Sequence, residues 1–294
     1  MDPVLVTSGN IGNHVAEGLA AKGVPVRVLS QKISPNPRWQ AAGIDQVAGD
    51  FSDPESLVPA FRGVDKYFSV TPFVENLAQL GINSIEAAKR AGVKYIVRSS
   101  ALGASEDAVI TLGRWHAQVE KALERSGIPY TILQPNTFMQ SYFMHAPSIK
   151  AQSAFYLPQG DGKVSVVDVR DIAAVAVVAL TESGHEGRKY TITGGEALSN
   201  YEIAEMLSKA LGRKISYVDV TEEKARDSMR GQGMPDWFVN ALLELLQISR
   251  AGDVAKVSPV VEQILKRKPI SFDQFLSDHI QDFIVMQTAG SVRA

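Results

Sequence analysis

The chain has 294 residues, a length that fits one large α/β domain with an appended lobe. It is 45% hydrophobic and 21% charged, and its formal net charge of −2 gives no argument for a nucleic-acid or membrane-surface partner. The absence of cysteine excludes disulfides, thiolate metal sites and a cysteine nucleophile, and the five scattered histidines lack metal-site spacing. No apolar run could span a bilayer and no signal-peptide pattern opens the chain, so we expect a cytoplasmic protein without nucleic-acid, membrane or metal partners.

The first stretch predicts a strand that turns through glycines into a helix. Residues 3–6 form a short apolar run typical of a buried strand, and apolar residues recur at helical spacing from Ile11 to Ala20. Such a turn points backbone N–H groups and the positive end of the helix dipole at one place, which binds phosphate. Gly9 would let the backbone approach a pyrophosphate, and Gly12 would let the helix pack closely on the strand. The alternative is a glycine turn that binds no ligand.

Strand and helix signals then alternate as far as Gln134. We predict strands at residues 24–29, 44–48, 64–70, 93–98 and 129–133, and helices at 38–42, 52–61, 76–91 and 108–126. The second of these helices would have Ser52 or Asp53 as its N-cap and Pro54 at its first helical position. Strands that alternate with helices at short loop lengths predict a doubly wound parallel sheet of the Rossmann type, in the α/β class.

Beyond Gln134 helices dominate. They are expected at residues 168–181, 201–211, 222–230, 236–248, 257–266 and 271–282, with short strands at 164–167, 190–193 and 215–218. We therefore assign residues 1–150 to a dinucleotide-binding domain, with a strand and helix near 163–182 packing back on it. Residues 151–286 would form a smaller, mostly helical substrate lobe, and 287–294 a tail.

The end of the second predicted strand suits a phosphorylated ribose. In a doubly wound sheet this strand end meets the adenosine ribose, where an acid favours NAD and basic or hydroxyl groups favour NADP. The chain reads Ser30-Gln31-Lys32 there, with Arg27 inside the strand, Arg38 downstream and no carboxylate at the strand end. We therefore predict that NADP(H) is preferred over NAD(H); the alternative is a solvated loop.

Three further strand ends carry polar residues. Asp50 and Phe51 end the third strand, where Asp50 could face the adenine amino group or form an Asx turn. Small hydroxyl residues end the fourth and fifth strands, where a nicotinamide ribose would lie. The residues at these two ends are Ser69, Thr71, Pro72, Ser99 and Ser100.

Short motifs run along nearly the whole chain. They include Gly9-Asn10-Ile11-Gly12, Gly49-Asp50-Phe51, His116-Ala117-Gln118-Val119-Glu120, Pro135-Asn136-Thr137-Phe138-Met139 and Val167-Asp168-Val169-Arg170-Asp171. As a set they resemble the NmrA-like group of atypical short-chain dehydrogenases. The resemblance implies transfer of hydride from NADPH to a small conjugated acceptor such as a quinone, an azo or similar dye, or an imine. The alternative is a catalytically weak NADP(H)-sensing regulator that acts through a protein partner.

Two positions depart from that group. The opening turn is shorter than its usual T-G-A-T-G-x-I-G, because Thr7 is followed directly by Ser8-Gly9, which leaves fewer N–H donors for a pyrophosphate. Gln134 stands where many relatives carry arginine.

The tyrosine–lysine pair of short-chain dehydrogenases is missing. None of the eight tyrosines has lysine four residues later, the spacing that puts both side chains on one helix face. The resemblance places His116 at the lysine position and Leu112 at the tyrosine position. His116 is therefore the candidate catalytic residue, as a proton donor or as a support for the nicotinamide ribose. The alternative is a helix-face histidine hydrogen-bonded to Glu120.

The complete set of candidate ligand-binding residues follows from these arguments and from the resemblance. The cofactor would contact Thr7, Gly9, Asn10, Ile11, Gly12, Ser30, Gln31, Lys32, Asp50, Phe51, Ser69, Thr71, Pro72, Ser99, Ser100, His116, Pro135 and Asn136. A flat, apolar acceptor would meet Phe138, Met139, Tyr142, Phe143 and Trp237, unless these aromatic and sulfur-containing side chains belong to the core. Either a monomer or a homodimer is compatible with the sequence.

Overall fold

The computed structural model describes residues 2–284 and divides into two units. Unit 1 contains the chain up to Asn136 together with Val169–Gly195 and Ser258–Pro269, and unit 2 contains Thr137–Asp168, Glu196–Val257 and the residues from Ile270 onward. The expected boundary at residue 150 therefore moves to Asn136, and residues 163–168 lie in unit 2 rather than with the sheet. The predicted tail at 287–294 lies outside the described residues.

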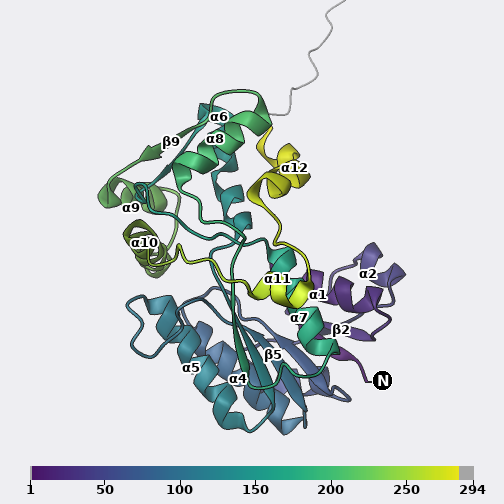
Figure 1. Ribbon diagram of the computed structural model, residues 1–294. Coiled ribbons are helices and arrows are strands. Elements are labelled where there is room, and N and C mark those ends of the chain that lie inside the picture. The colour runs from purple at the N-terminus through teal and green to yellow at the C-terminus, as the bar shows by residue number, and fades with distance from the viewer. Residues whose placement is uncertain (1, 285–294) are drawn as a thin grey trace, which may run out of the picture. The chain divides into compact units, whose positions relative to one another are not determined.

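Unit 1 is built around a seven-stranded parallel sheet (Figure 1). Its strands are β1 (Val4–Thr7), β2 (Val26–Ser30), β3 (Asp45–Ala48), β4 (Lys66–Ser69), β5 (Tyr95–Ser99), β6 (Tyr130–Pro135) and β8 (Arg188–Ile192). Their order is β3-β2-β1-β4-β5-β6-β8, so the direction of winding reverses between β1 and β4. The predicted Rossmann-type sheet is confirmed. One detail differs: β8, which we expected in the lobe, pairs with β6.

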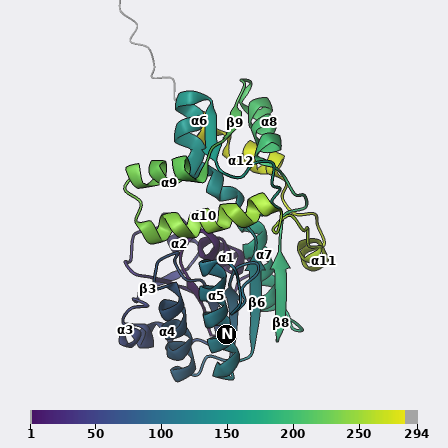
Figure 2. The ribbon, with the colours of Figure 1, turned by 90° about the vertical axis from the view of Figure 1, so that its left-hand side faces the viewer.

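Helices cover both faces of this sheet (Figure 2). On one face, α1 (Asn10–Ala21) packs against α7 (Val169–Thr181), which packs against α11 (Val260–Leu265). On the other face, α3 (Pro54–Phe61), α4 (Leu77–Arg90) and α5 (Thr111–Ser126) pack in sequence. The short α2 (Pro37–Ala41) joins β2 to β3. Because both faces are covered, the inner strands β1 and β5 are buried at every residue, whereas the edge strands β3 and β8 are partly exposed.

Local chemistry explains where these helices begin and end. The Asp53 side chain accepts a hydrogen bond from the Glu55 N–H, and Pro54 occupies the first helical position, so α3 begins where the sequence predicted. The end of α5 is set by Gly127, whose φ of 78° favours glycine. The core between the sheet and α3–α5 includes Tyr67 and Ile96, both without exposed surface.

Unit 2 combines short helices with a two-stranded parallel sheet. It contains η1 (Met139–His145), α6 (Ala146–Gln152), β7 (Ala154–Leu157), α8 (Asn200–Leu211), β9 (Ser216–Asp219), α9 (Glu222–Gly231), α10 (Asp236–Ala251) and α12 (Phe272–Phe283), and β7 pairs with β9. The expected strand at 164–167 is wrong, since this segment makes only single bridges at Val164 and Val167. The sequence missed η1, α6 and β7, because elements of four to seven residues are too short to show a period.

Candidate cofactor and active site

The turn between β1 and α1 has the backbone geometry of a phosphate site. Gly9 has a φ of 126° and a ψ of −174°, a conformation open in practice only to glycine. A Cβ atom at Gly12 would lie 1.7 Å from the carbonyl oxygen of Thr7, so glycine is required for α1 to approach β1. The first turn of α1 has no side-chain cap and no acidic residue, which leaves N–H groups and the positive dipole end for an anion. These features fit the pyrophosphate of a dinucleotide.

One donor of this turn is engaged within the chain. The Gly9 N–H donates to Oδ1 of Asn13 at 3.1 Å, one turn into α1. Thr7, at the end of β1, is held by a 2.9 Å hydrogen bond between its hydroxyl and that of the buried Tyr67 on β4. The turn is therefore joined to the sheet interior by side chains as well as by its glycines.

The end of β2 lies beside a carboxylate that the sequence pattern of β2 alone does not show. Gln31 Nε2 donates to Asp50 Oδ2 at 2.9 Å. The other oxygen of Asp50 accepts from the Ser52 N–H at 2.8 Å and from its hydroxyl at 2.7 Å. Asp50 thus forms an Asx turn, the second of the two roles expected for it. These hydrogen bonds, of which the one from the Ser52 N–H has the largest effect, lower the pKa of its carboxyl group.

The basic residues near β2 do not share one role. The guanidinium of Arg27 donates to the carbonyl oxygens of Ala60 and Arg62, at 3.1 and 2.9 Å, and is thereby tied to the end of α3. Lys32 and Arg38 are exposed, and neither forms an ion pair within residues 2–284. These two are the cations near the end of β2 that remain available to a ribose phosphate.

A buried polar cluster lies at the ends of β4 and β5. The guanidinium of Arg98, on β5, has no exposed surface. It donates to the hydroxyls of Ser69 and Thr71, both at 3.3 Å, and one terminal nitrogen lies 3.5 Å from Nδ1 of His116 on α5. Burial lowers the pKa of Arg98 to about 10, so it remains charged near neutral pH. Burial, and secondarily the Arg98 charge, lower the pKa of His116 to about 3, so its imidazole is neutral.

Glu120, one turn further along α5, is a buried carboxylate with three donors. One oxygen accepts from the Ser100 hydroxyl at 2.6 Å and from Gln134 Nε2 at 2.9 Å. The other accepts from the Lys189 ammonium at 2.8 Å. The alternative that paired His116 with Glu120 is therefore wrong, because the side-chain hydrogen bond of His116 is with Arg98.

The remaining cofactor candidates occupy strand ends in unit 1. Ser99 ends β5, Pro135 ends β6, and the N–H of Asn136 donates to the carbonyl oxygen of Ile192 at 2.9 Å. Sequence reasoning missed Arg98 and Lys189 as members of the polar cluster. The signal for Arg98 was present, because a charged residue directly follows three apolar residues of the buried strand.

All five acceptor-pocket candidates lie in unit 2. Met139 and Tyr142 are buried in its aromatic core. The Tyr142 hydroxyl donates to Asn200 Oδ1 at 2.8 Å, and its ring packs edge-on against Phe272 at 5.2 Å. The core alternative thus accounts for these two. The other three are partly exposed: Phe138, Phe143 and Trp237.

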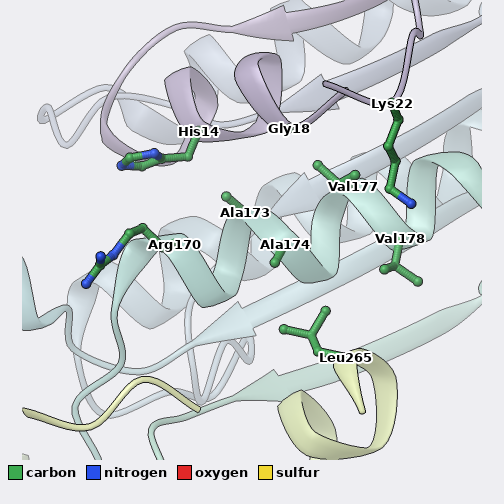
Figure 3. Close-up of a pocket in the computed structure, with 9 residues that line it drawn as sticks. All are labelled: His14, Gly18, Lys22, Arg170, Ala173, Ala174, Val177, Val178 and Leu265. Atoms are coloured by element: carbon green, nitrogen blue, oxygen red, sulfur yellow. The ribbon is translucent and has the colours of Figure 1, made fainter. Parts of the chain in front are cut away.

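A separate groove of about 350 Å³ runs between α1, α7 and α11 (Figure 3). His14 and Arg170 stand at one end, Lys22, which directly follows α1, stands at the other, and alanine and valine side chains of α7 lie between them. It contains none of the strand-end residues. Within residues 2–284, no group of three His, Asp or Glu side chains could hold a metal ion, and none of the helices there is long and apolar enough to cross a membrane.

Comparison with known proteins agrees with this geometry. The model of the NmrA-like family matches residues 3–276, nearly the whole described chain. The chain belongs to the NmrA-like family. Among its relatives, the NAD(P)H azoreductase of Xenophilus azovorans is 40% identical over 276 residues, covering 94% of this chain and 96% of that protein. The quinone oxidoreductase 2 of Escherichia coli is 31% identical, covering 81% of this chain and 84% of that protein.

The fold of this NmrA-like protein is similar to those of two reductases whose structures were solved with bound cofactor. An NADPH-dependent quinone oxidoreductase of Escherichia coli, complexed with NADPH, has a TM-score of 0.85 at 27% identity, covering 94% of this chain and 99% of that one. A triphenylmethane reductase of a Citrobacter species, complexed with NADP(H), has a TM-score of 0.83 at 25% identity, with the same coverage. The chain thus belongs to a family that includes NAD(P)H-dependent oxidoreductases.

Proposed function

We propose that this NmrA-like protein is an NADPH-dependent reductase of a small conjugated acceptor, such as a quinone, an azo or related dye, or an imine. The observation that carries the proposal is the polar cluster at the ends of β4 and β5, which offers hydroxyl groups and a neutral histidine but no tyrosine–lysine pair. Such a site suits an electron-poor acceptor, because water can supply the proton and orientation contributes most of the catalysis. The reductase relatives support the proposal.

The chain would hold the dinucleotide along the carboxyl ends of its strands. The Gly9–Gly12 turn would bind the pyrophosphate, Ser30 and Lys32 the ribose phosphate, and Asp50 with Phe51 would border the adenine ring. Toward the nicotinamide, Ser69, Thr71, Pro72, Ser99, Ser100, Pro135 and Asn136 would border the ribose and ring. When bound, NADPH supplies the hydride. The part of the protein is to fix the angle and distance between the two reactants.

The preference for NADPH is proposed to be moderate. Lys32 and Arg38 favour a 2′-phosphate, whereas the Asp50 carboxylate, reached by Gln31 at 2.9 Å, brings a negative charge to the same region. These opposing charges predict that NADH is accepted less readily but not rejected. The relative from Xenophilus azovorans is named an NAD(P)H azoreductase, a name that includes both cofactors and supports this proposal.

Steady-state assays test the function directly. Purified protein would be given NADPH or NADH with a quinone, an azo dye and a triphenylmethane dye, and oxidation of the cofactor would be followed optically. We expect turnover of at least one acceptor with a higher kcat/KM for NADPH. Thermal shift is measured in parallel, because a ligand at about 100 times its Kd adds roughly 2.7 kcal/mol of stability. Binding without turnover of any acceptor would favour the sensor alternative, and absence of binding would refute both.

A further inference from the structure

Arg98 carries a fully buried guanidinium whose hydrogen-bonding neighbours are all neutral. Its Nε makes no hydrogen bond within the described residues. Burying a charge without a carboxylate in contact costs free energy, and an unsatisfied buried polar atom calls for an explanation. Glu120 affects Arg98 only through space, since its oxygens are bound by Ser100, Gln134 and Lys189. A contribution to the stability of the fold therefore does not explain why an arginine occupies position 98.

The contact between Arg98 and His116 fixes the direction of one hydrogen bond. A guanidinium can only donate, so Nδ1 of His116 must accept, and the hydrogen of the neutral ring then lies on Nε2. Protonating Nδ1 would bring two cations together. The Glu120 carboxylate, one turn along α5, is the nearby anion of the cluster, but three donors from other elements occupy it. Nε2 itself makes no hydrogen bond within residues 2–284, so its N–H is available.

This N–H belongs to the cluster at the carboxyl ends of β4 and β5, where open parallel sheets bind ligands. We propose that Arg98 is a positioning residue that holds His116 as the neutral Nε2–H tautomer, a hydrogen-bond donor to an oxygen of the bound ligand. That oxygen belongs either to the nicotinamide ribose or to the acceptor. The inference rests on the proposed function, and it gives a role to a buried cation that the mechanism does not otherwise use. A charged donor on Nδ1 strengthens Nε2–H as a donor.

Nuclear magnetic resonance of the ligand-free protein tests the tautomer without any activity. Long-range ¹H–¹⁵N correlations of ¹⁵N-histidine protein report which ring nitrogen carries the hydrogen, and the His116→Gln spectrum identifies the His116 signals among the five histidines. We expect only the Nε2–H form at pH 7. In Arg98→Met the second tautomer should appear, because no donor then faces Nδ1. A wild-type ring protonated on Nδ1, or an unchanged pattern in Arg98→Met, would overturn the proposal.

Stability and function separate a positioning role from a structural one. Methionine fills similar space without a charge, so Arg98→Met should keep or raise the Tm, because it removes a buried charge that lacks an anionic partner. It should lower NADPH affinity or kcat roughly 10-fold, the scale of one lost or weakened hydrogen bond. Arg98→Lys, which retains a charge, should recover part of this loss. Arg125→Gln, an exposed residue of α5, is the control and should change neither quantity. A large fall in Tm for Arg98→Met with no change in affinity or kcat would mean that Arg98 is structural.

His116→Gln identifies the ligand oxygen. If the ribose is the acceptor of the hydrogen bond, the Kd of NADP⁺ and of NADPH should both rise, even where no turnover is seen. If the oxygen belongs to the substrate, both Kd values should hold while kcat or the acceptor KM changes. If the His116→Gln protein reduces an acceptor with unchanged cofactor Kd values, kcat and acceptor KM, the inference fails while the proposed function stands. If there is no turnover, the tautomer and the NADP⁺ affinity still test Arg98.

Discussion

The two ends of the candidate site are built in different ways. The glycine turn between β1 and α1 consists of backbone: two glycines within four residues, the start of α1, and a strand end beneath them. The cluster at β4 and β5 consists of side chains from β4, β5, α5, β6 and β8, most of them buried, with partners up to 69 residues apart. The turn therefore depends on backbone geometry and the cluster on charge. Substitutions at the two places should differ in their effects on stability and on cofactor affinity.

The largest effect should come from the backbone end. Gly12→Ala places a Cβ atom 1.7 Å from the Thr7 carbonyl oxygen, and this contact can be relieved only if α1 shifts away from β1. We expect a loss of about 3 kcal/mol in the free energy of unfolding and at least a roughly 100-fold rise in the Kd of NADPH. Urea denaturation and fluorescence titration measure the two. Gly231→Ala in α9, where the new Cβ meets nothing, is the control and should be neutral or slightly stabilising. Normal NADPH affinity in Gly12→Ala would place the pyrophosphate elsewhere.

Charge removal in the buried cluster should come next. Glu120→Ala leaves Ser100, Gln134 and Lys189 without their shared acceptor, and we expect a loss of about 2–4 kcal/mol of stability. Glu124→Ala removes the more exposed partner of the same lysine, so it should cost less than about 1 kcal/mol. Equal effects of the two substitutions, measured by urea denaturation, would contradict the view that Glu120 organises the cluster.

The same division explains what the sequence could predict. Alternating strands and helices, the Asp53 cap and the two glycines are local features, and the structure has the sheet and its glycine turn as expected. The contact of Arg98 with His116 joins β5 to α5, and Lys189 reaches Glu120 from β8, so each depends on packing that no short pattern encodes. Arg27 shows the converse. Its basic character suggested a phosphate ligand, but the packing of α3 on the sheet gives it carbonyl partners.

Acid should weaken the buried side-chain cluster before it affects the turn. The pKa of His116 is lowered to about 3 and that of His145 in unit 2 to about 4, chiefly by burial. Between these values and the unfolded value near 6.5, the unfolded chain binds protons that the folded chain does not, so stability falls as pH falls. Each histidine contributes a slope of up to about 1.4 kcal/mol per pH unit. Urea denaturation from pH 7 to pH 5.5 measures it, a range that stays at least one unit above the ordinary carboxyl pKa values of 3.8 for Asp and 4.5 for Glu.

His116→Gln provides the control for this pH dependence. It should remove the His116 share of the slope and leave that of His145 intact, because the two histidines lie in different units. A slope that is unchanged in His116→Gln would mean that His116 is protonated in the folded protein, contrary to its contact with Arg98.

The smallest effects should appear at the end of β2, where the charges are exposed. Lys32→Gln should raise the Kd of NADPH by roughly 3- to 10-fold and leave that of NADH unchanged, since only NADPH carries the 2′-phosphate.

Asp50→Asn keeps an oxygen for the Ser52 N–H but removes the negative charge beside Gln31, so it should raise the preference for NADPH a few-fold. The effects of Lys32→Gln and Asp50→Asn on the cofactor Kd values should both be smaller at high salt than at low salt, because exposed charges are screened over about 10 Å at 0.1 M. Lys22→Gln, an exposed lysine at the far end of α1, should change neither Kd. If Asp50→Asn weakened both cofactors equally, the carboxylate would act on the adenosine common to them, and cofactor preference would rest on the cations alone.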